Sequence, residues 1–88
     1  MPSYNISLKP SVEKDLRSLP KSTVIRVIEQ IEGLKTAPLP RKALKLSNAE
    51  HLYRIRVGDY RIVYEVDIKD RQVLIHYVRH RREVYRSI

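Results

Sequence analysis

The chain has 88 residues and 42% hydrophobic content, enough for a single domain, residues 1–88, with a small core. It has no cysteine and no apolar run near the roughly 20 residues that span a bilayer, which excludes disulfides, thiol catalysis and a membrane helix; we expect a cytoplasmic protein. The net charge of +8 indicates a polyanionic partner, and residues 41–88 hold most of it, with 12 Lys or Arg against 6 Asp or Glu.

The first third of the chain is predicted to form a strand and two helices. Residues 4 to 8 alternate apolar and polar side chains, as in a half-buried strand. Val12, Leu16 and Leu19 then recur at helical spacing until Pro20 ends the helix. A second helix, about residues 20 to 35, carries an apolar stripe made of Val24, Ile28, Ile31 and Leu34. The two helices are predicted to form a helical hairpin whose apolar side packs on a sheet.

The rest of the chain is predicted to be loop and then sheet. Residues 36 to 50 contain two prolines and basic side chains, and we interpret them as a loop with a short turn. Strands are expected at residues 52–57, 60–66 and 72–78, the first two joined at Gly58-Asp59. The predicted fold is α+β, in the order β-α-α-β-β-β, with the helical hairpin on one face of an antiparallel sheet. A short helix or tail, residues 81–88, ends it.

The predicted hairpin gathers arginines on one face of the sheet. A two-residue turn places Arg56 opposite Arg61, with Arg54 on the same side. The other side then carries the apolar side chains Tyr53, Ile55, Val57, Tyr60, Ile62 and Tyr64. Like charges opposed across strands cost roughly 0.2–1 kcal/mol, so stability alone gives no reason for this pair. A bound anion between the two guanidinium groups would explain the pair, because arginine donates paired hydrogen bonds to phosphate. The alternative is a solvated basic face with Glu65 as counter-charge.

The C-terminal segment adds cations, an aromatic ring and a histidine. If helical, it places Arg81 and Tyr85 on one side, where they suit single-stranded RNA; alternatively, Tyr85 and Val84 only attach the tail to the core. His80 is a candidate general base, because neighbouring arginines favour its neutral form, whereas we interpret His76 as a packed histidine. No metal-ligand cluster or cofactor motif is present in the sequence, so we expect neither a metal nor a cofactor.

Two segments together resemble a known family. These are Tyr53-Arg54-Ile55-Arg56-Val57-Gly58-Asp59-Tyr60-Arg61-Ile62-Val63-Tyr64 and His80-Arg81-Arg82-Glu83-Val84-Tyr85. They are similar to the RelE/ParE toxin superfamily, and the similarity covers nearly the whole chain. The resemblance implies the toxin of a type II toxin–antitoxin system, an endoribonuclease that cleaves mRNA in the ribosomal A site by 2′-hydroxyl attack. Its partners would be the ribosome, mRNA and a cognate antitoxin, with no membrane and with DNA contacted only through the antitoxin.

The resemblance also implies roles for individual residues. Arg61, Arg81 and Tyr85 would be catalytic, while Arg54 and Arg56 would bind the mRNA phosphate. RelE has lysines at the positions of Arg54 and Arg56, and arginine does not serve as a base because it keeps its proton. The base is then His80, Tyr85, or absent, with alignment and electrostatics alone driving the reaction. Two rival functions are a ParE-like DNA gyrase inhibitor without RNA chemistry and an inactive RNA-binding or scaffold protein.

Overall fold

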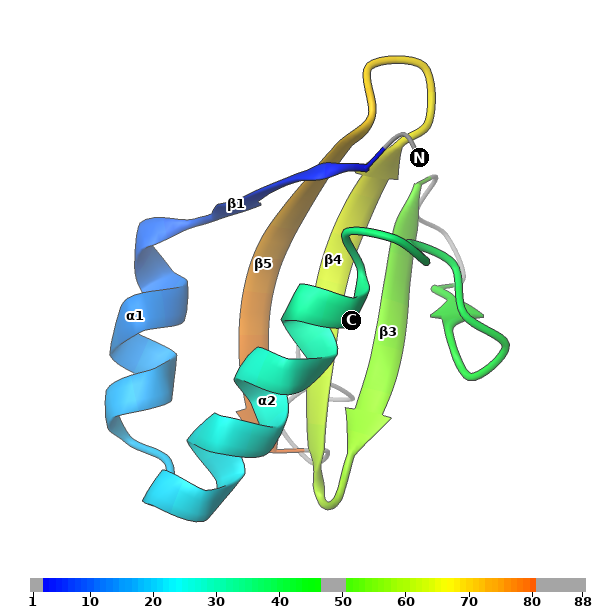
Figure 1. Ribbon diagram of the computed structural model, residues 1–88. Helices are drawn as coiled ribbons and strands as arrows, with labels where there is room; N and C mark the ends of the chain where they lie inside the picture. The colour runs from blue at the N-terminus through cyan, green and yellow to red at the C-terminus, as the bar shows by residue number, and fades with distance from the viewer. Residues whose placement is uncertain (1–2, 47–50, 81–88) are drawn as a thin grey trace.

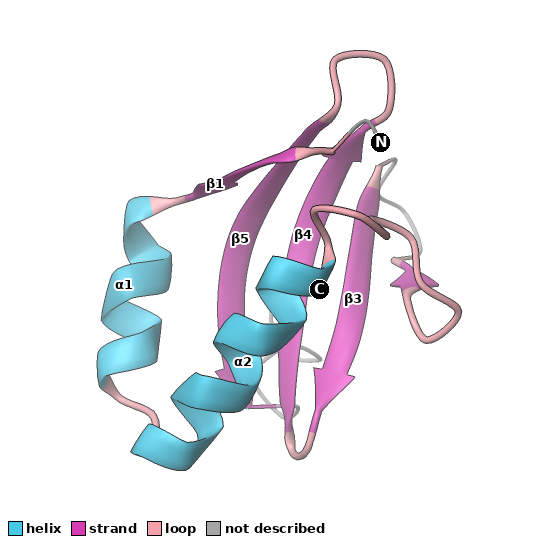
Figure 2. Cartoon of the chain, viewed as in Figure 1, coloured by secondary structure: helices cyan, strands magenta, loops and turns pink. Residues whose placement is uncertain are grey.

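The computed structural model describes residues 3–46 and 51–80. Two helices and five strands follow one another along these residues: β1 (Asn5–Leu8), α1 (Pro10–Arg17), α2 (Lys21–Gly33), β2 (Leu44–Lys45), β3 (Leu52–Val57), β4 (Tyr60–Asp67) and β5 (Gln72–His80). Figure 2 shows them as one helical layer on one sheet. The predicted α+β fold is therefore confirmed. None of the described helices is both long and apolar enough to cross a membrane.

The sheet has the strand order β1-β5-β4-β3-β2 and is mixed, where we predicted an antiparallel one. β1 pairs in parallel with β5, and the other three neighbouring pairs are antiparallel. The parallel pair arises because the two helices carry the chain from one edge of the sheet to the other (Figure 1). The meander β3-β4-β5 then brings the chain back beside β1, where β5 runs in the same direction.

Each helix covers a different part of the sheet. α2 lies across the face formed by β3 and β4, while α1 lies beside β5 (Figure 1). Val12 of α1 and Val27 and Ile31 of α2 are buried in the core. The predicted stripe of α2 was wrong at Ile28, which is 39% exposed. Val27 faces the sheet instead of Ile28, because Val27 lies four residues before the buried Ile31 and therefore on the same side of the helix.

Two polar side chains of α1 protect the part of β5 that β1 does not reach. β1 pairs with β5 only as far as Ile75. Beyond it, the Ser11 hydroxyl donates to the His76 carbonyl at 3.3 Å, and the Asp15 carboxylate accepts from the Val78 amide at 3.1 Å. Unpaired strand edges invite unwanted pairing, so these two bonds close the edge while fixing α1 to the sheet.

The loop after α2 leads into a strand that the sequence pattern did not predict. β2 pairs with β3 through Leu44 opposite Arg54 and Lys45 opposite Tyr53. The fully buried Tyr64 donates its phenol proton to the Pro38 carbonyl at 2.8 Å, which fixes this loop against the sheet. Burial raises the pKa of the Tyr64 phenol, and Tyr53 raises it further. The neutral phenol therefore remains a donor at physiological pH.

Candidate nucleic-acid interface

The turn between β3 and β4 sets the register on which the site depends. Gly58 has φ of +60°, a backbone conformation that residues with a Cβ rarely adopt, and with Asp59 it forms the predicted two-residue connection. Val57 lies opposite Tyr60, Arg56 opposite Arg61, and so on along the hairpin. This register is the predicted one and is confirmed. The arginines therefore occupy one face of the sheet, opposite the face that the helices cover.

A row of three arginines crosses the three central strands of the sheet next to the Gly58-Asp59 turn. Arg56 of β3 lies opposite Arg61 of β4, and Arg61 lies opposite Arg79 of β5. We call the surface formed by Arg54, Arg56, Arg61 and Arg79 the arginine face. Arg79 stacks its guanidinium carbon 4.4 Å from the ring centroid of Tyr77, an arrangement in which the ring stabilises the cation. The row concentrates positive charge, although like charges opposite one another do not stabilise paired strands.

Arg61 is the one charged residue that is buried among those the structure describes, with 7% of its surface exposed. Its Nη1 donates to the Tyr60 carbonyl at 3.2 Å and to the Gly58 carbonyl at 3.5 Å, while Arg56 Nε donates to the same Gly58 carbonyl at 3.2 Å. Backbone oxygens satisfy some of these donors, but neither guanidinium forms an ion pair within the described chain. A cation that is desolvated and lacks a carboxylate is well suited to bind an anion.

A hollow of about 250 Å³ lies beside this row. It is lined by Lys42, Leu44, Arg54, Arg56 and Arg61, without an acidic side chain. Because β2 was not predicted, neither Lys42 nor Leu44 was expected here; the amine of Lys42 donates to the side chain of Gln30 on α2. The hollow therefore offers four cations to a ligand that reaches across β2, β3 and β4.

The β5 side of the arginine face depends on an irregularity in the sheet. The pairing of β4 with β5 shifts between Val63 and Tyr64, so that Tyr64 lies opposite Ile75 but Val63 lies opposite Tyr77. This bulge leaves His76 without an opposite residue and reverses the faces of all later residues in β5. It is the reason that Arg79 joins Arg61. Without the bulge, Arg79 would point toward the helices.

The same bulge separates the two histidines. His80 lies opposite Tyr60 on the helix face, with the two rings edge to face and 5.6 Å apart between centroids. The structure therefore does not bring His80 to Arg54, Arg56 and Arg61. His76 instead contacts Glu65, with 3.2 Å between Nε2 and Oε1. Glu65, the expected counter-charge of the arginines, therefore contacts His76.

Tyr77 is an aromatic residue of the arginine face that the sequence analysis missed. It lies opposite the buried Val63. Burial raises the pKa of its phenol, and the nearby Arg79 charge offsets part of that rise. The two remaining predicted site residues, Arg81 and Tyr85, lie outside the described residues.

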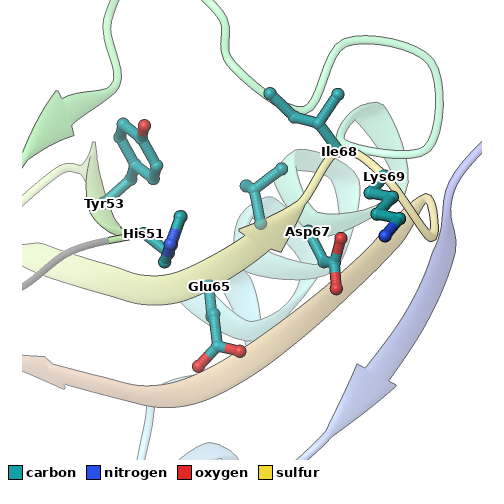
Figure 3. Close-up of a pocket in the computed structure, with 7 residues that line it drawn as sticks. His51, Tyr53, Glu65, Asp67, Ile68 and Lys69 are labelled. Carbon is teal, nitrogen blue, oxygen red and sulfur yellow. The ribbon is translucent and has the colours of Figure 1, made fainter.

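A second hollow, of about 300 Å³, lies at the far end of the sheet from the Gly58-Asp59 turn. Its lining includes apolar, acidic and basic side chains: His51, Tyr53, Glu65, Val66, Asp67, Ile68 and Lys69 (Figure 3). Asp67 already accepts a hydrogen bond from the Asp70 amide, and Glu65 contacts His76. With its charges mixed, this hollow lacks the one-sided charge of the arginine face. Within the described ranges, no cluster of three metal-ligating side chains occurs.

Comparison with known proteins agrees with this geometry. The family model described as the ParE toxin of type II toxin–antitoxin systems matches residues 6–85. The RelE1 protein of Methanocaldococcus jannaschii is 33% identical over 87 residues, covering 96% of this chain and 97% of that protein. The toxin RelE of Mycobacterium tuberculosis is 30% identical over 84 residues, covering 94% and 87%.

Solved structures give the same assignment. The RelE–RelB complex from Pyrococcus horikoshii contains a chain that superposes with a TM-score of 0.80 at 36% identity, covering 92% of this chain and 97% of that one. In the RelBE2 toxin–antitoxin complex of Mycobacterium tuberculosis, the TM-score is 0.76 at 28% identity, over 89% and 98% of the two chains. The chain therefore belongs to the RelE/ParE superfamily and is a RelE-like toxin of a type II toxin–antitoxin system.

Proposed function

We propose that this toxin is a ribosome-dependent endoribonuclease that cleaves mRNA in the ribosomal A site. The observation that carries the proposal is the row of Arg56, Arg61 and Arg79, which has Lys42 and Arg54 beside it and an acid-free hollow next to it. Such a surface is suited to phosphate, because guanidinium groups donate paired hydrogen bonds and remain charged at every physiological pH.

The proposed chemistry is attack of a ribose 2′-oxygen on the adjacent phosphorus. The 2′-hydroxyl gives up its proton to solvent water, the bond from phosphorus to the 5′-oxygen breaks, a 2′,3′-cyclic phosphate forms, and the departing 5′-oxygen takes up a proton from solvent. Negative charge grows on the phosphoryl oxygens in the transition state, and Arg61 with Arg56 would stabilise it from a partly desolvated position. We propose further that Arg81 contacts the phosphate or the leaving oxygen and that Tyr85 stacks on or orients the reacting nucleotide.

We assign none of the described residues the role of general base for the 2′-hydroxyl proton, and we therefore propose a mechanism without a base. His80 faces the helices, and burial raises the pKa of the Tyr77 phenol, so that it stays protonated and offers little phenolate to accept a proton. Alignment of the 2′-oxygen by the ribosome and stabilisation of charge by arginines then supply the rate enhancement. Tyr85 remains the alternative base within this proposal.

A cognate antitoxin is the proposed partner that restrains this activity. The similar proteins from Pyrococcus horikoshii and Mycobacterium tuberculosis were solved as complexes with a RelB protein and in a RelBE2 complex, respectively. An acidic or amphipathic segment laid across the arginine face would neutralise part of the +8 charge and exclude RNA. We propose that DNA is contacted only through this antitoxin and that the toxin acts in the cytoplasm, where ribosomes translate.

Gyrase inhibition is the second candidate, favoured by the match to the ParE family model. A translating extract separates the two functions. Wild-type toxin and the variants Arg61→Ala, Arg81→Ala and Tyr85→Ala are added, and mRNA ends are mapped by primer extension. Ribosome-dependent cuts that the variants lose would support the endoribonuclease. Uncut mRNA, together with loss of DNA supercoiling by purified gyrase, would establish the gyrase inhibitor instead.

A further inference from the structure

A third arginine, after Arg56 and Arg61, meets the turn between β3 and β4 from the helical layer. Arg26 is an exposed residue of α2, whose N-terminal half lies near this turn (Figure 1). A Cβ added to Gly58 would lie 3.5 Å from Arg26 Nη1 and 4.0 Å from Nη2. The Arg26 guanidinium therefore packs against the backbone of the turn from the helix side.

Arg26 and the arginine face thus surround one turn from two sides. The Gly58 carbonyl accepts hydrogen bonds from Arg56 and Arg61, while the Cα of the same glycine faces Arg26. Within the described chain, Arg26, Arg56 and Arg61 form no ion pair. Three guanidinium groups around one residue repel one another, and an anion bound from outside the described chain would relieve this repulsion.

We propose that Arg26 binds an RNA backbone phosphate next to the one held by the arginine face. The inference rests on the proposed function and deepens it, because it extends the RNA path around the Gly58-Asp59 turn. A single RNA strand carries one negative charge per nucleotide and bends freely, so consecutive phosphates reach cations on both sides of a turn. A rigid acidic helix would meet only one side.

The test compares variants that leave the fold intact. Arg26→Ala removes the cation, Arg26→Lys keeps the charge but loses the planar fork, and Arg17→Ala is the matched control. Arg17 is also an exposed helical arginine, but it lies 3.8 Å from the Glu13 carboxylate. Circular dichroism checks the fold of each variant.

Two probes are used: a short fluorescein-labelled single-stranded oligoribonucleotide, followed by anisotropy at stepped salt concentrations, and ribosomes with or without mRNA. For Arg26→Ala we expect about ten-fold weaker RNA binding, because one charge-assisted contact is lost. The slope of log affinity against log salt should become shallower by about 0.7, the value for one phosphate on a single strand. Arg26→Lys should lose less affinity and keep the slope, and Arg17→Ala should match the wild type.

The ribosome measurements identify the source of the phosphate. A defect of Arg26→Ala that requires mRNA assigns the phosphate to mRNA, and a defect that persists without mRNA assigns it to ribosomal RNA; both support the proposal. Unchanged RNA and ribosome binding in Arg26→Ala overturns it. If the wild type binds RNA but leaves mRNA uncut, the proposed function fails while the Arg26 comparison still decides this inference. If the wild type binds neither probe, both fall.

Discussion

The two faces of the β3–β4 hairpin have the same backbone but opposite physical roles. One face packs Ile55, Ile62 and Tyr64 against the helices, with at most 1% of each residue exposed. The other presents Arg56 opposite Arg61, a pair that lowers stability. Because side chains alternate along a strand, neighbouring residues in the sequence belong to different faces. The comparison teaches that stability and RNA binding should be separable by substitutions one residue apart.

The largest expected effect on stability is on the helix face. Ile62→Ala should lower the free energy of unfolding by about 2–5 kcal/mol, since Ile62 is fully buried and its removal leaves a cavity. Urea denaturation followed by circular dichroism measures the change. Ile62→Val, the matched control, should lose only about 0.5–1.5 kcal/mol. A loss below 1 kcal/mol for Ile62→Ala would contradict the assignment of this face to the core.

Arg61→Met, at the residue before Ile62, should lower mRNA cleavage without lowering stability. Methionine keeps a long unbranched chain but removes the charge, so we expect mRNA cleavage to fall about 100-fold, or ~2.7 kcal/mol of transition-state stabilisation. The free energy of unfolding should rise by about 0.2–1 kcal/mol, because the like-charge pair with Arg56 disappears. Primer extension and urea denaturation measure the two quantities. Unchanged cleavage, or a clear loss of stability, would place Arg61 in the structural role instead.

The hairpin register could be predicted because its signals are local. Gly58-Asp59 is flanked by residues of strict two-residue alternation, and a two-residue turn leaves one way to pair them. The fold class followed from the order of the predicted helices and strands. β2 was not predictable, because two residues are too few to show a period, and Lys42 was missed with it.

The bulge in β5 could not be predicted with equal ease. Val73 and Ile75 face the core at odd positions, and then Val78 does so at an even one, which is the signal of an inserted residue. Leu74 and Tyr77 hide this signal, because they are also apolar and make the strand look continuous. Packing against the helices sets the register, because Val78 is buried in the core when it faces them.

Tyr64→Phe tests the link from the core face to the loop that carries Lys42. Loss of the hydrogen bond to the half-buried Pro38 carbonyl should cost about 0.5–1.5 kcal/mol, the usual net contribution of one hydrogen bond. The folded-state pKa of Tyr64 is raised above its ordinary value of about 10, so its contribution is present below pH 10 and is lost as the pH rises further.

Urea denaturation from neutral pH to above pH 10 measures both effects. The wild type should lose stability steeply above pH 10, and Tyr64→Phe should lose less over the same range. Tyr53→Phe, at a less buried neighbour whose ring centroid lies 6.1 Å away, leaves the hydrogen bond from Tyr64 to Pro38 in place and should keep most of the pH dependence. Equal pH dependence in the wild type and Tyr64→Phe would be inconsistent with a buried neutral phenol at this position.

The smallest effects should separate two neighbours in β5. Arg79→Gln should lower mRNA cleavage about ten-fold, since Arg79 extends the row beside Arg61 and one charge-assisted contact is lost. His80→Gln should leave cleavage within about two-fold of the wild type, because His80 contacts Tyr60 on the helix face. The same primer-extension assay, run over a pH series, compares them. If His80→Gln lost cleavage and its pH dependence while Arg79→Gln did not, the faces of β5 would be exchanged, which is the arrangement that the strand has without its bulge.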